Sequence, residues 1–299
     1  MKTTKNNPLR LKVLITAGFL LVGASVVMFL TLSSPFRNEF NGERAYQDVL
    51  AQVALGPRVP DSQAHEEVIV YIQNELKKAG WNSEVRQSDW NSFGIRNIVA
   101  HRSNSDAAII LGAHYDSRLL ADQDPGPGGS KPVPGANDGA SGVAILLELA
   151  RTLPNNTVPI WLVFFDAEDN GGLDGRAWIM GSKAFVEGLD FTPRMAIIVD
   201  MVGDSDLNIY YERNSSSTLT NEIWTQAARL GYQDYFIPEP KYSMIDDHTP
   251  FLNAGIPAVD IIDFDYPYWH TSQDTPDKVS SNSLKVVGDT LKAWIETQH

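Results

Sequence analysis

Four short apolar runs, at residues 107–111, 158–165, 194–199 and 256–262, constrain the fold of this chain most strongly. Each is long enough for one β-strand, and two further strands are predicted at 95–100 and 207–211. Segments with apolar residues at helical spacing are interspersed with them, at 61–79, 140–153, 177–189, 219–230 and 283–295. Apolar strands alternating with helices are typical of a mostly parallel sheet that helices cover on both faces. The sequence therefore predicts an α/β fold with a single domain.

Composition excludes several classes of protein. The chain has 299 residues, of which 43% are hydrophobic, so it has enough apolar content for a large core. It contains no cysteine, which excludes disulfides, thiolate metal sites and a cysteine nucleophile. A net charge of −13 argues against general electrostatic binding to nucleic acid, so we expect no nucleic-acid partner.

The N-terminus carries a predicted membrane segment. Residues 13–34 contain no charged side chain and are enough to cross a bilayer as one helix. Four basic residues and no acidic residue precede them, which predicts a cytoplasmic segment at 1–12 and an extracytoplasmic remainder. We expect an uncleaved anchor, a linker at 35–45 and a catalytic domain at 46–299. The alternative is a cleaved signal peptide, which would make the protein secreted.

Metal-binding side chains follow the predicted strands. Ligands of open α/β sheets bind beyond the carboxyl ends of the strands, so polar residues there are the first candidates for chemistry. Two histidines and three carboxylates occupy such positions: His114, Asp138, Asp169, Asp200 and His270. This is a donor set typical of zinc in sites that keep open positions. Singly, each aspartate is equally explained as a helix cap or a turn residue.

Three neighbours of these residues complete the predicted site. Glu168 adjoins the candidate ligand Asp169 without being needed as a ligand, as a general base requires. Asp116, two residues after His114, is placed to accept a hydrogen bond from the second ring nitrogen of that histidine. His248 is interpreted as structural or as part of the pocket wall. The remaining histidines are predicted at the surface: His65, His101 and His299.

Five ordered motifs lie between about residues 45 and 297: Gly112-Ala113-His114-Tyr115-Asp116-Ser117, Gly135-Ala136-Asn137-Asp138-Gly139-Ala140-Ser141-Gly142, Asp166-Ala167-Glu168-Asp169, Asp246-Asp247-His248-Thr249-Pro250-Phe251 and Tyr268-Trp269-His270-Thr271. They resemble a known family, the zinc-dependent peptidases of family M28, which includes aminopeptidases and glutaminyl cyclases. The resemblance implies a central mixed sheet. In the aminopeptidase branch it implies one zinc on His114, Asp138 and Asp200 and a second on Asp138, Asp169 and His270. Glu168 matches the general acid/base of the family.

The resemblance leaves two branches of the family open. Trp178, Trp269 and Asp246 resemble the cyclase branch, in which tryptophans wall the substrate pocket. That branch implies one zinc, cyclisation of an N-terminal glutamine with release of ammonia, and a hydrogen-bond network that joins Glu168 to Asp200 and Asp246.

The loop from Asn137 to Gly142 has the aminopeptidase form. That branch implies two zinc ions and hydrolysis of the first peptide bond. Peptide or protein N-termini are the expected substrates in either case. A binding domain without activity is the third alternative.

Overall fold

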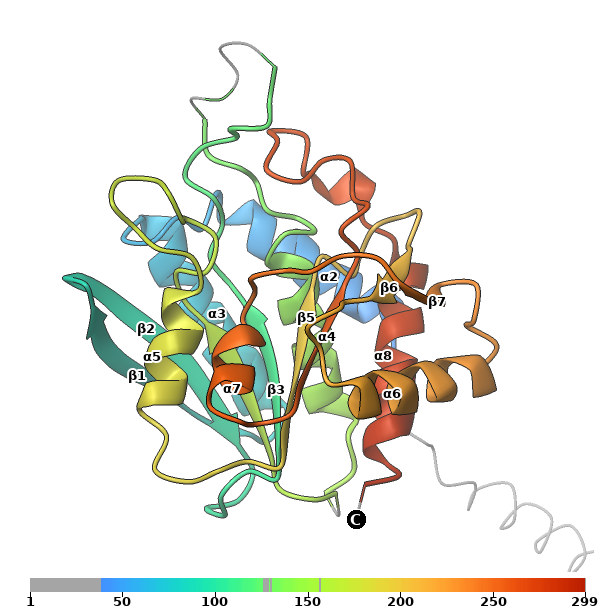
Figure 1. Ribbon diagram of the computed structural model, residues 1–299. Helices are drawn as coiled ribbons and strands as arrows, with labels where there is room; N and C mark the ends of the chain where they lie inside the picture. The colour runs from blue at the N-terminus through green and yellow to red at the C-terminus, as the bar shows by residue number, and fades with distance from the viewer. Residues whose placement is uncertain (1–38, 126–128, 130, 156, 299) are drawn as a thin grey trace, which may run out of the picture. The chain divides into compact units, whose positions relative to one another are not determined.

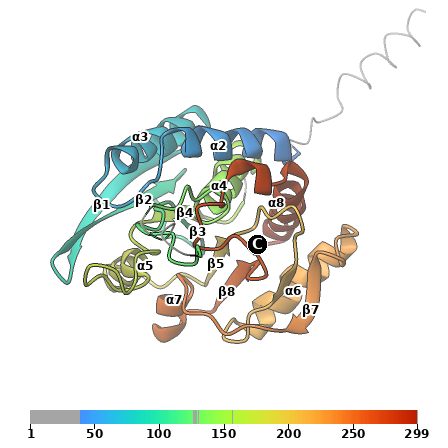
Figure 2. The same ribbon diagram turned by 90° about the horizontal axis from the view of Figure 1, so that it is seen from above.

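The computed structural model describes residues 39–125, 129, 131–155 and 157–298. Figure 1 labels most of the helices and strands, and Figure 2 also labels β4 and β8. The helices are α2 (Gly42–Ala54), α3 (Gln63–Lys78), α4 (Ala140–Thr152), α5 (Met180–Glu187), α6 (Ser217–Arg229), α7 (Thr249–Asn253), the 3₁₀ helix η2 (Pro276–Lys278) and α8 (Ser281–Ile295). The strands are β1 (Asn82–Trp90), β2 (Phe93–His101), β3 (Ile109–His114), β4 (Ile160–Phe165), β5 (Met195–Asp200), β6 (Ile209–Tyr211), β7 (Phe236–Pro240) and β8 (Ala258–Ile262).

Six of these strands form one mixed sheet in the order β1-β2-β4-β3-β5-β8. Strands β4, β3, β5 and β8 are parallel to one another, whereas β2 runs antiparallel to β4 and to the edge strand β1. The parallel strands consequently end at one edge of the sheet, and β3 and β5 end on His114 and Asp200. A separate pair of strands, β6 and β7, lies outside this sheet.

Helices cover both faces of the sheet (Figure 2). Successive side chains of a strand point to opposite faces, so residues of β3 and β4 divide between two cores. Leu111 and Leu162 pack in the larger core, against α2, α3, α4 and α8. Ile110 and Val163 pack in the smaller core, with residues of α5 and α7. Helix α4 is buried on nearly all sides, which explains its almost continuous apolar sequence.

The predicted α/β class, the mostly parallel sheet and the helices on both faces are confirmed. Strands β1 and β7 were not predicted. In β1, exposed and half-buried residues alternate and none is buried, so no apolar run marks it. The predicted strand at 207–211 pairs with β7 and contributes nothing to the main sheet.

The predicted linker at 35–45 is wrong for residues 40–45. Asn41 accepts a hydrogen bond from the backbone N–H of Arg44 and so caps α2, which begins at Gly42. Phe40 is buried against Gly288 of α8, where a side chain on residue 288 would collide with the phenyl ring. The folded domain therefore includes Phe40 and α2. Helix α2 was not predicted, because its buried face mixes the apolar residues Ala45 and Val49 with Gly42, Asp48 and Gln52.

Within the described part of the chain, no helix combines the length and apolar character needed to cross a bilayer. The predicted cytoplasmic segment at 1–12 and the predicted anchor at 13–34 lie outside the described residues.

Candidate active site

The first group of candidate ligands forms where β3 and β5 end. His114 Nε2 lies 3.0 Å from Asp200 Oδ1 and 3.2 Å from Asp138 Oδ1. Because β3 and β5 are parallel neighbours, the last residues of both reach the same edge of the sheet. Asp138 joins them from the turn that leads into α4. We call His114, Asp138 and Asp200 the His114 group.

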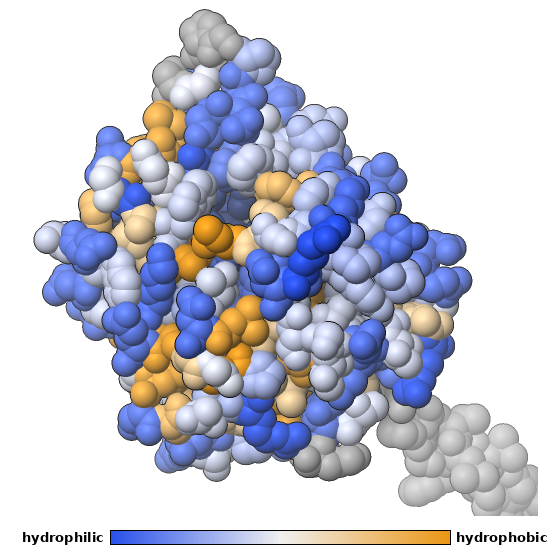
Figure 3. Space-filling model, viewed as in Figure 1, coloured by the Kyte–Doolittle hydropathy of each residue, from blue (hydrophilic) through white to orange (hydrophobic). Residues whose placement is uncertain are grey.

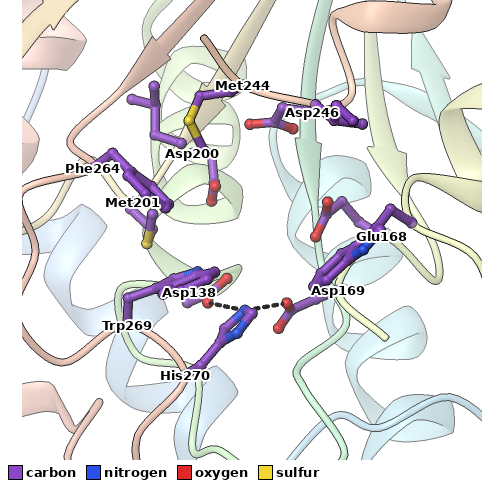
Figure 4. Close-up of a pocket in the computed structure, with 13 residues that line it drawn as sticks. Asp138, Glu168, Asp169, Asp200, Met201, Met244, Asp246, Phe264, Trp269 and His270 are labelled. Atoms are coloured by element: carbon purple, nitrogen blue, oxygen red, sulfur yellow. Dashed lines mark hydrogen bonds and ion pairs between the residues drawn. The ribbon is translucent and has the colours of Figure 1, made fainter. Parts of the chain in front are cut away.

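The second group shares one residue with the first. His270 Nε2 lies 2.7 Å from Asp169 Oδ1 and 3.8 Å from Asp138 Oδ2, as the dashed lines in Figure 4 mark. We call Asp138, Asp169 and His270 the His270 group. Asp138 therefore directs one carboxylate oxygen toward each histidine. In each group the three potential ligand atoms lie within 4.8 Å of one another.

The geometry fits metal binding at both groups. All five side chains are buried, and the second carboxylate oxygens of Asp138 and Asp169 have no hydrogen-bond partner. A buried carboxylate oxygen without a partner is costly unless a cation is bound there. Each group offers imidazole nitrogen and carboxylate oxygen from three residues, which is the donor number of zinc sites that keep an open position. The structure thus brings all five predicted ligands together in one site.

Two further aspartates orient the histidines. Asp116 Oδ1 lies 3.5 Å from His114 Nδ1, next to the ring as the sequence predicted, but the predicted hydrogen bond is not formed at this distance. It also accepts the backbone N–H groups of Glu168 and Asp169, which fixes the loop after β4. Asp122 Oδ1 lies 3.6 Å from His270 Nδ1 and plays the same part in the His270 group. Sequence reasoning missed Asp122, because only the fold brings it near His270.

Arg118 connects the parts of the His270 group. Its guanidinium forms a two-point ion pair with Asp122, at 2.6 and 2.9 Å. The same group donates to the backbone oxygen of Asp169 at 2.7 Å and lies 4.8 Å from the ring centre of Trp178. Arg118 therefore contacts the candidate ligand Asp169, the aspartate beside His270, and Trp178 in the pocket wall. No motif in the sequence pointed to it.

A glycine allows the approach of β3 to α4. Gly139 has a φ of +94°, and a Cβ there would lie 2.6 Å from the backbone oxygen of Asp116 and 3.2 Å from His114 Cε1. Any other residue would be strained and would collide with the strand end that carries a ligand. Gly139 therefore fixes how closely Asp138 approaches His114.

Burial sets the protonation of the acids in the site. It raises the pKa of Glu168 well above its usual range, and the charges of Asp169 and Asp246 add to the effect. Burial likewise raises the pKa of Asp200 to about 7 and that of Asp169 to about 6. For Asp138, burial opposes ionisation, but hydrogen bonding to His114 and the charges of both histidines lower its pKa overall. Glu168 is consequently the carboxylate best suited to accept and return a proton.

A cavity of about 200 Å³ opens onto the His270 group. The face in Figure 3 is hollowed near its centre, with apolar side chains gathered beside the hollow. The lining residues are Asp138, Glu168, Asp169, Trp178, Asp200, Met201, Met244, Ile245, Asp246, Ile262, Phe264, Trp269 and His270. Both predicted tryptophans are among them. Trp269 stacks on His270 with ring centres 3.8 Å apart, and Trp178 lies parallel to it at 5.9 Å.

The structure does not place His248 in the wall of this pocket. His248 is completely buried, with Nε2 3.3 Å from Glu212 Oε2 and Nδ1 3.7 Å from Asp260 Oδ2. It belongs to a buried polar cluster behind the pocket. Glu212 also accepts the backbone N–H of Met244, so the cluster supports a lining residue. The structural alternative for His248 is therefore correct.

The expectation that His65 lies at the surface is wrong. Its side chain is buried, donates a hydrogen bond from Nε2 to Asp166 Oδ1 at 2.7 Å, and stacks on Tyr115. The burial of His65 could not be predicted from helical spacing, because His65 lies in the first turn of α3, where polar residues are usually solvated. His101 is half-buried on β2, and His299 lies outside the described residues.

Comparison with known proteins identifies the family. A model described as Peptidase family M28 matches residues 97–295, which include every candidate ligand. This chain belongs to peptidase family M28. Solved relatives in that family include a zinc-dependent exopeptidase from Parabacteroides distasonis, with 31% identity and a TM-score of 0.81 over 87% of this chain and 99% of the relative.

The similar proteins divide between two activities. A glutaminyl cyclase from Tannerella forsythia is 33% identical, with a TM-score of 0.80 over 87% of this chain and 100% of the cyclase. The aminopeptidase YwaD of Bacillus subtilis is 29% identical over 62% of this chain, but the match spans only 40% of that aminopeptidase. The expectation that this M28 protein is an enzyme is confirmed, because its relatives are cyclases and zinc-dependent exopeptidases.

Proposed function

We propose that this chain is a glutaminyl-peptide cyclotransferase, which converts an N-terminal glutamine into pyroglutamate and releases ammonia. The observation that carries the proposal is the pocket beside the His270 group, which is small and walled by Trp178 and Trp269. Such a pocket suits one uncharged side chain and leaves little room for water. Similarity to the cyclase of Tannerella forsythia over its whole length supports the same activity.

Glu168 is proposed to move the proton. The α-amine attacks the side-chain carbonyl carbon of the glutamine, a C–N bond forms, and Glu168 accepts the proton that the amine loses. Glu168 then donates this proton to the departing NH₂ group, so ammonia leaves and the carboxylate is restored. Burial and the nearby acids raise the proton affinity of Glu168, which favours the first transfer. Asp200 and Asp246 line the same cavity and would hold Glu168 in place.

The His270 group would hold the zinc ion used in this reaction, because it lies directly beside the tryptophans. Zinc bound there supplies a Lewis acid that polarises the glutamine carbonyl. Asp138, Asp169 and His270 would bind it, with Asp122 orienting the imidazole. We propose one catalytic zinc for this function.

An aminopeptidase is the second candidate, because the His114 group supplies another complete set of three ligands that shares Asp138. Under this alternative the protein binds two zinc ions. Glu168 takes a proton from water, which attacks the first peptide bond, and the free N-terminal residue is released. The similarity to the Bacillus subtilis aminopeptidase supports this candidate.

Mass spectrometry of reaction products separates the two functions. The full-length protein, loaded with zinc, is incubated with one peptide beginning with Gln and a matched peptide beginning with Leu. Ammonia loss from the Gln peptide, with the Leu peptide intact, is the result expected for a cyclase. Release of free leucine would overturn the cyclase proposal and establish the aminopeptidase. Absence of both products in the presence of bound zinc would contradict both.

We propose in addition that residues 13–34 anchor an extracytoplasmic catalytic domain in the membrane. The uncharged run behind a basic N-terminus supports this proposal. Retention of the full-length protein in membranes after alkaline carbonate extraction is the expected result. Recovery of a soluble form whose N-terminus starts after residue 34 would instead establish cleavage and secretion.

A further inference from the structure

Ile245 is set apart from the other residues of the pocket. It has the most exposed large apolar side chain in the described part of the chain, with 69% of its surface exposed. Every other residue that lines the pocket is buried or half-buried. Single exposed apolar side chains are common on proteins, so exposure alone carries no argument. The argument rests on the position of Ile245, because this exposed side chain also lines the cavity and so lies at the mouth of the pocket.

The backbone around Ile245 is held by hydrogen bonds on both sides. The N–H of Met244 donates to Glu212 Oε1 at 2.9 Å, and Asn214 Nδ2 donates to the backbone oxygen of Met244 at 3.2 Å. The N–H of Asp246 donates to Thr249 Oγ1 at 3.3 Å. The side chain of Ile245 is thus presented to solvent by a fixed backbone. A preformed apolar contact of this kind costs little conformational entropy when a ligand covers it.

The size of the pocket determines what reaches Ile245. A cavity of about 200 Å³ is small beside pockets for drug-sized ligands, and acids and indoles close its inner end. It holds one residue of a peptide. The second residue begins about 3.8 Å further along the chain and must lie at the mouth.

We propose that Ile245 forms a subsite for the second residue of the peptide and selects an apolar side chain there. This inference rests on the proposed function, since it requires that the pocket takes the N-terminal residue. The charge of the pocket supports the selection. Five carboxylates line the cavity, so an acidic second residue would be repelled by their charge. It would also lose solvation against the apolar side chain of Ile245.

The test compares peptides that begin with Gln and carry Leu, Gly or Asp as the second residue. We expect kcat/KM for the Leu peptide to exceed that for the Gly peptide about four- to fifteenfold, which is the effect of burying one or two methylene groups. The variant Ile245→Ser should lower this ratio to within about twofold, whereas Val70→Ser should leave both the ratio and kcat unchanged. Val70→Ser is the matched control, because Val70 is 57% exposed on α3, outside the pocket.

Three outcomes are decisive. Loss of the preference in Ile245→Ser, but not in Val70→Ser, supports the subsite. A preference that survives in Ile245→Ser, or no preference in the wild type, overturns it.

If the wild type instead removes the first residue, the proposed function fails. The same ratio measured on a Leu-Leu and Leu-Gly peptide pair then still tests Ile245. If no peptide reacts, quenching of tryptophan fluorescence by the peptides gives the same ratio from dissociation constants.

Discussion

At the scale of single residues, the site depends on partners that hold the ligands as much as on the ligands themselves. Arg118 is the clearest case, since it contacts Asp122, the backbone of Asp169 and the ring of Trp178. A lysine at this position keeps the charge but loses the fork that binds two oxygens of Asp122 and a third oxygen at once. Such partners of metal ligands typically change metal affinity about 10- to 100-fold.

We therefore expect Arg118→Lys to weaken zinc binding at the His270 group about tenfold, with little change at the His114 group. Zinc content after dialysis against a graded chelator series, measured by atomic emission, checks this. Arg229→Lys, on the exposed side of α6, is the control. Equal zinc retention by the Arg118 and Arg229 variants would contradict the assigned part of Arg118.

Replacing Glu168 with Gln removes the proton acceptor and keeps the shape of the side chain. We expect kcat to fall about 10²- to 10⁴-fold while zinc content and peptide binding stay within about twofold of the wild type. Stopped assays for ammonia and fluorescence titration measure the two quantities. Glu187→Gln, at the exposed end of α5, should leave both unchanged. An active Glu168→Gln variant would mean that another group transfers the proton.

The sequence identified the ligands because each follows an apolar strand or a glycine turn, and such positions can be read locally. Asp122, Arg118 and Glu212 could not be found in this way. Their contacts reach His270, Trp178 and Met244, which are distant in the chain, and nothing in their local sequence distinguishes them from surface charges. His65 was misinterpreted for the same reason, because its partner Asp166 lies 101 residues away.

At the scale of elements, the glycine-containing turn that leads into α4 decides how closely Asp138 approaches the end of β3. Gly139 and Gly80 both have positive φ, at +94° and +79°, but only Gly139 is crowded. Nothing lies within 4 Å of a Cβ placed on Gly80, after the end of α3. Substituting alanine at Gly80 therefore measures the backbone strain alone, whereas the same substitution at Gly139 adds a steric collision.

We expect Gly80→Ala to lower the free energy of unfolding by about 1–2 kcal/mol, the cost of a left-handed conformation. Gly139→Ala should cost more than this and also lower zinc content, because a Cβ would push Asp116 away from His114. Urea unfolding and metal analysis of both variants provide the measurement. Equal losses of stability with full zinc content would show that the crowding at Gly139 is relieved without moving the ligands.

Elements were predicted correctly where burial produces a continuous apolar run, as in β4, or apolar residues at helical spacing, as in α8. The pattern fails at the margins of the domain. β1 pairs with β2 along its full length, yet its side chains are half-buried at most, so hydrogen bonding rather than apolar content maintains it. The predicted linker extended to residue 45 and so included the first turn of α2, whose buried face contains the non-apolar residues Gly42, Asp48 and Gln52.

At the scale of the whole molecule, the buried acids make stability depend on pH. Burial raises the pKa of Asp263 and of Asp274 to about 7. Between their ordinary values near 3.8 and about 7, the folded state therefore binds more protons than the unfolded state. Stability consequently falls as pH rises through this window, and it is highest toward the acidic side.

For the protein stripped of zinc, we expect Tm to fall by at least about 5 °C between pH 5 and pH 7.5. Added zinc should raise Tm more at pH 7.5 than at pH 5, since the ligands Asp169 and Asp200 also bind protons at the lower pH. Differential scanning calorimetry with and without a chelator tests both statements. A Tm of the stripped protein that rises with pH would show that these acids are ionised at no cost.

The packing of α2 on α8 also determines when this domain is able to finish folding. The side chain of Glu43 in α2 accepts a hydrogen bond from Ser281, 238 residues later, and the ring of Phe40 covers Gly288. Helix α2 therefore completes its packing only after α8 has been synthesised. Until then α2 is able to pack on α4 but not on α8, so part of its apolar face stays exposed and is a binding surface for chaperones. A chain that stops before α8 leaves Phe40 and part of α2 exposed. The synthesis of α8, rather than of any single core strand, is therefore the step that completes the domain.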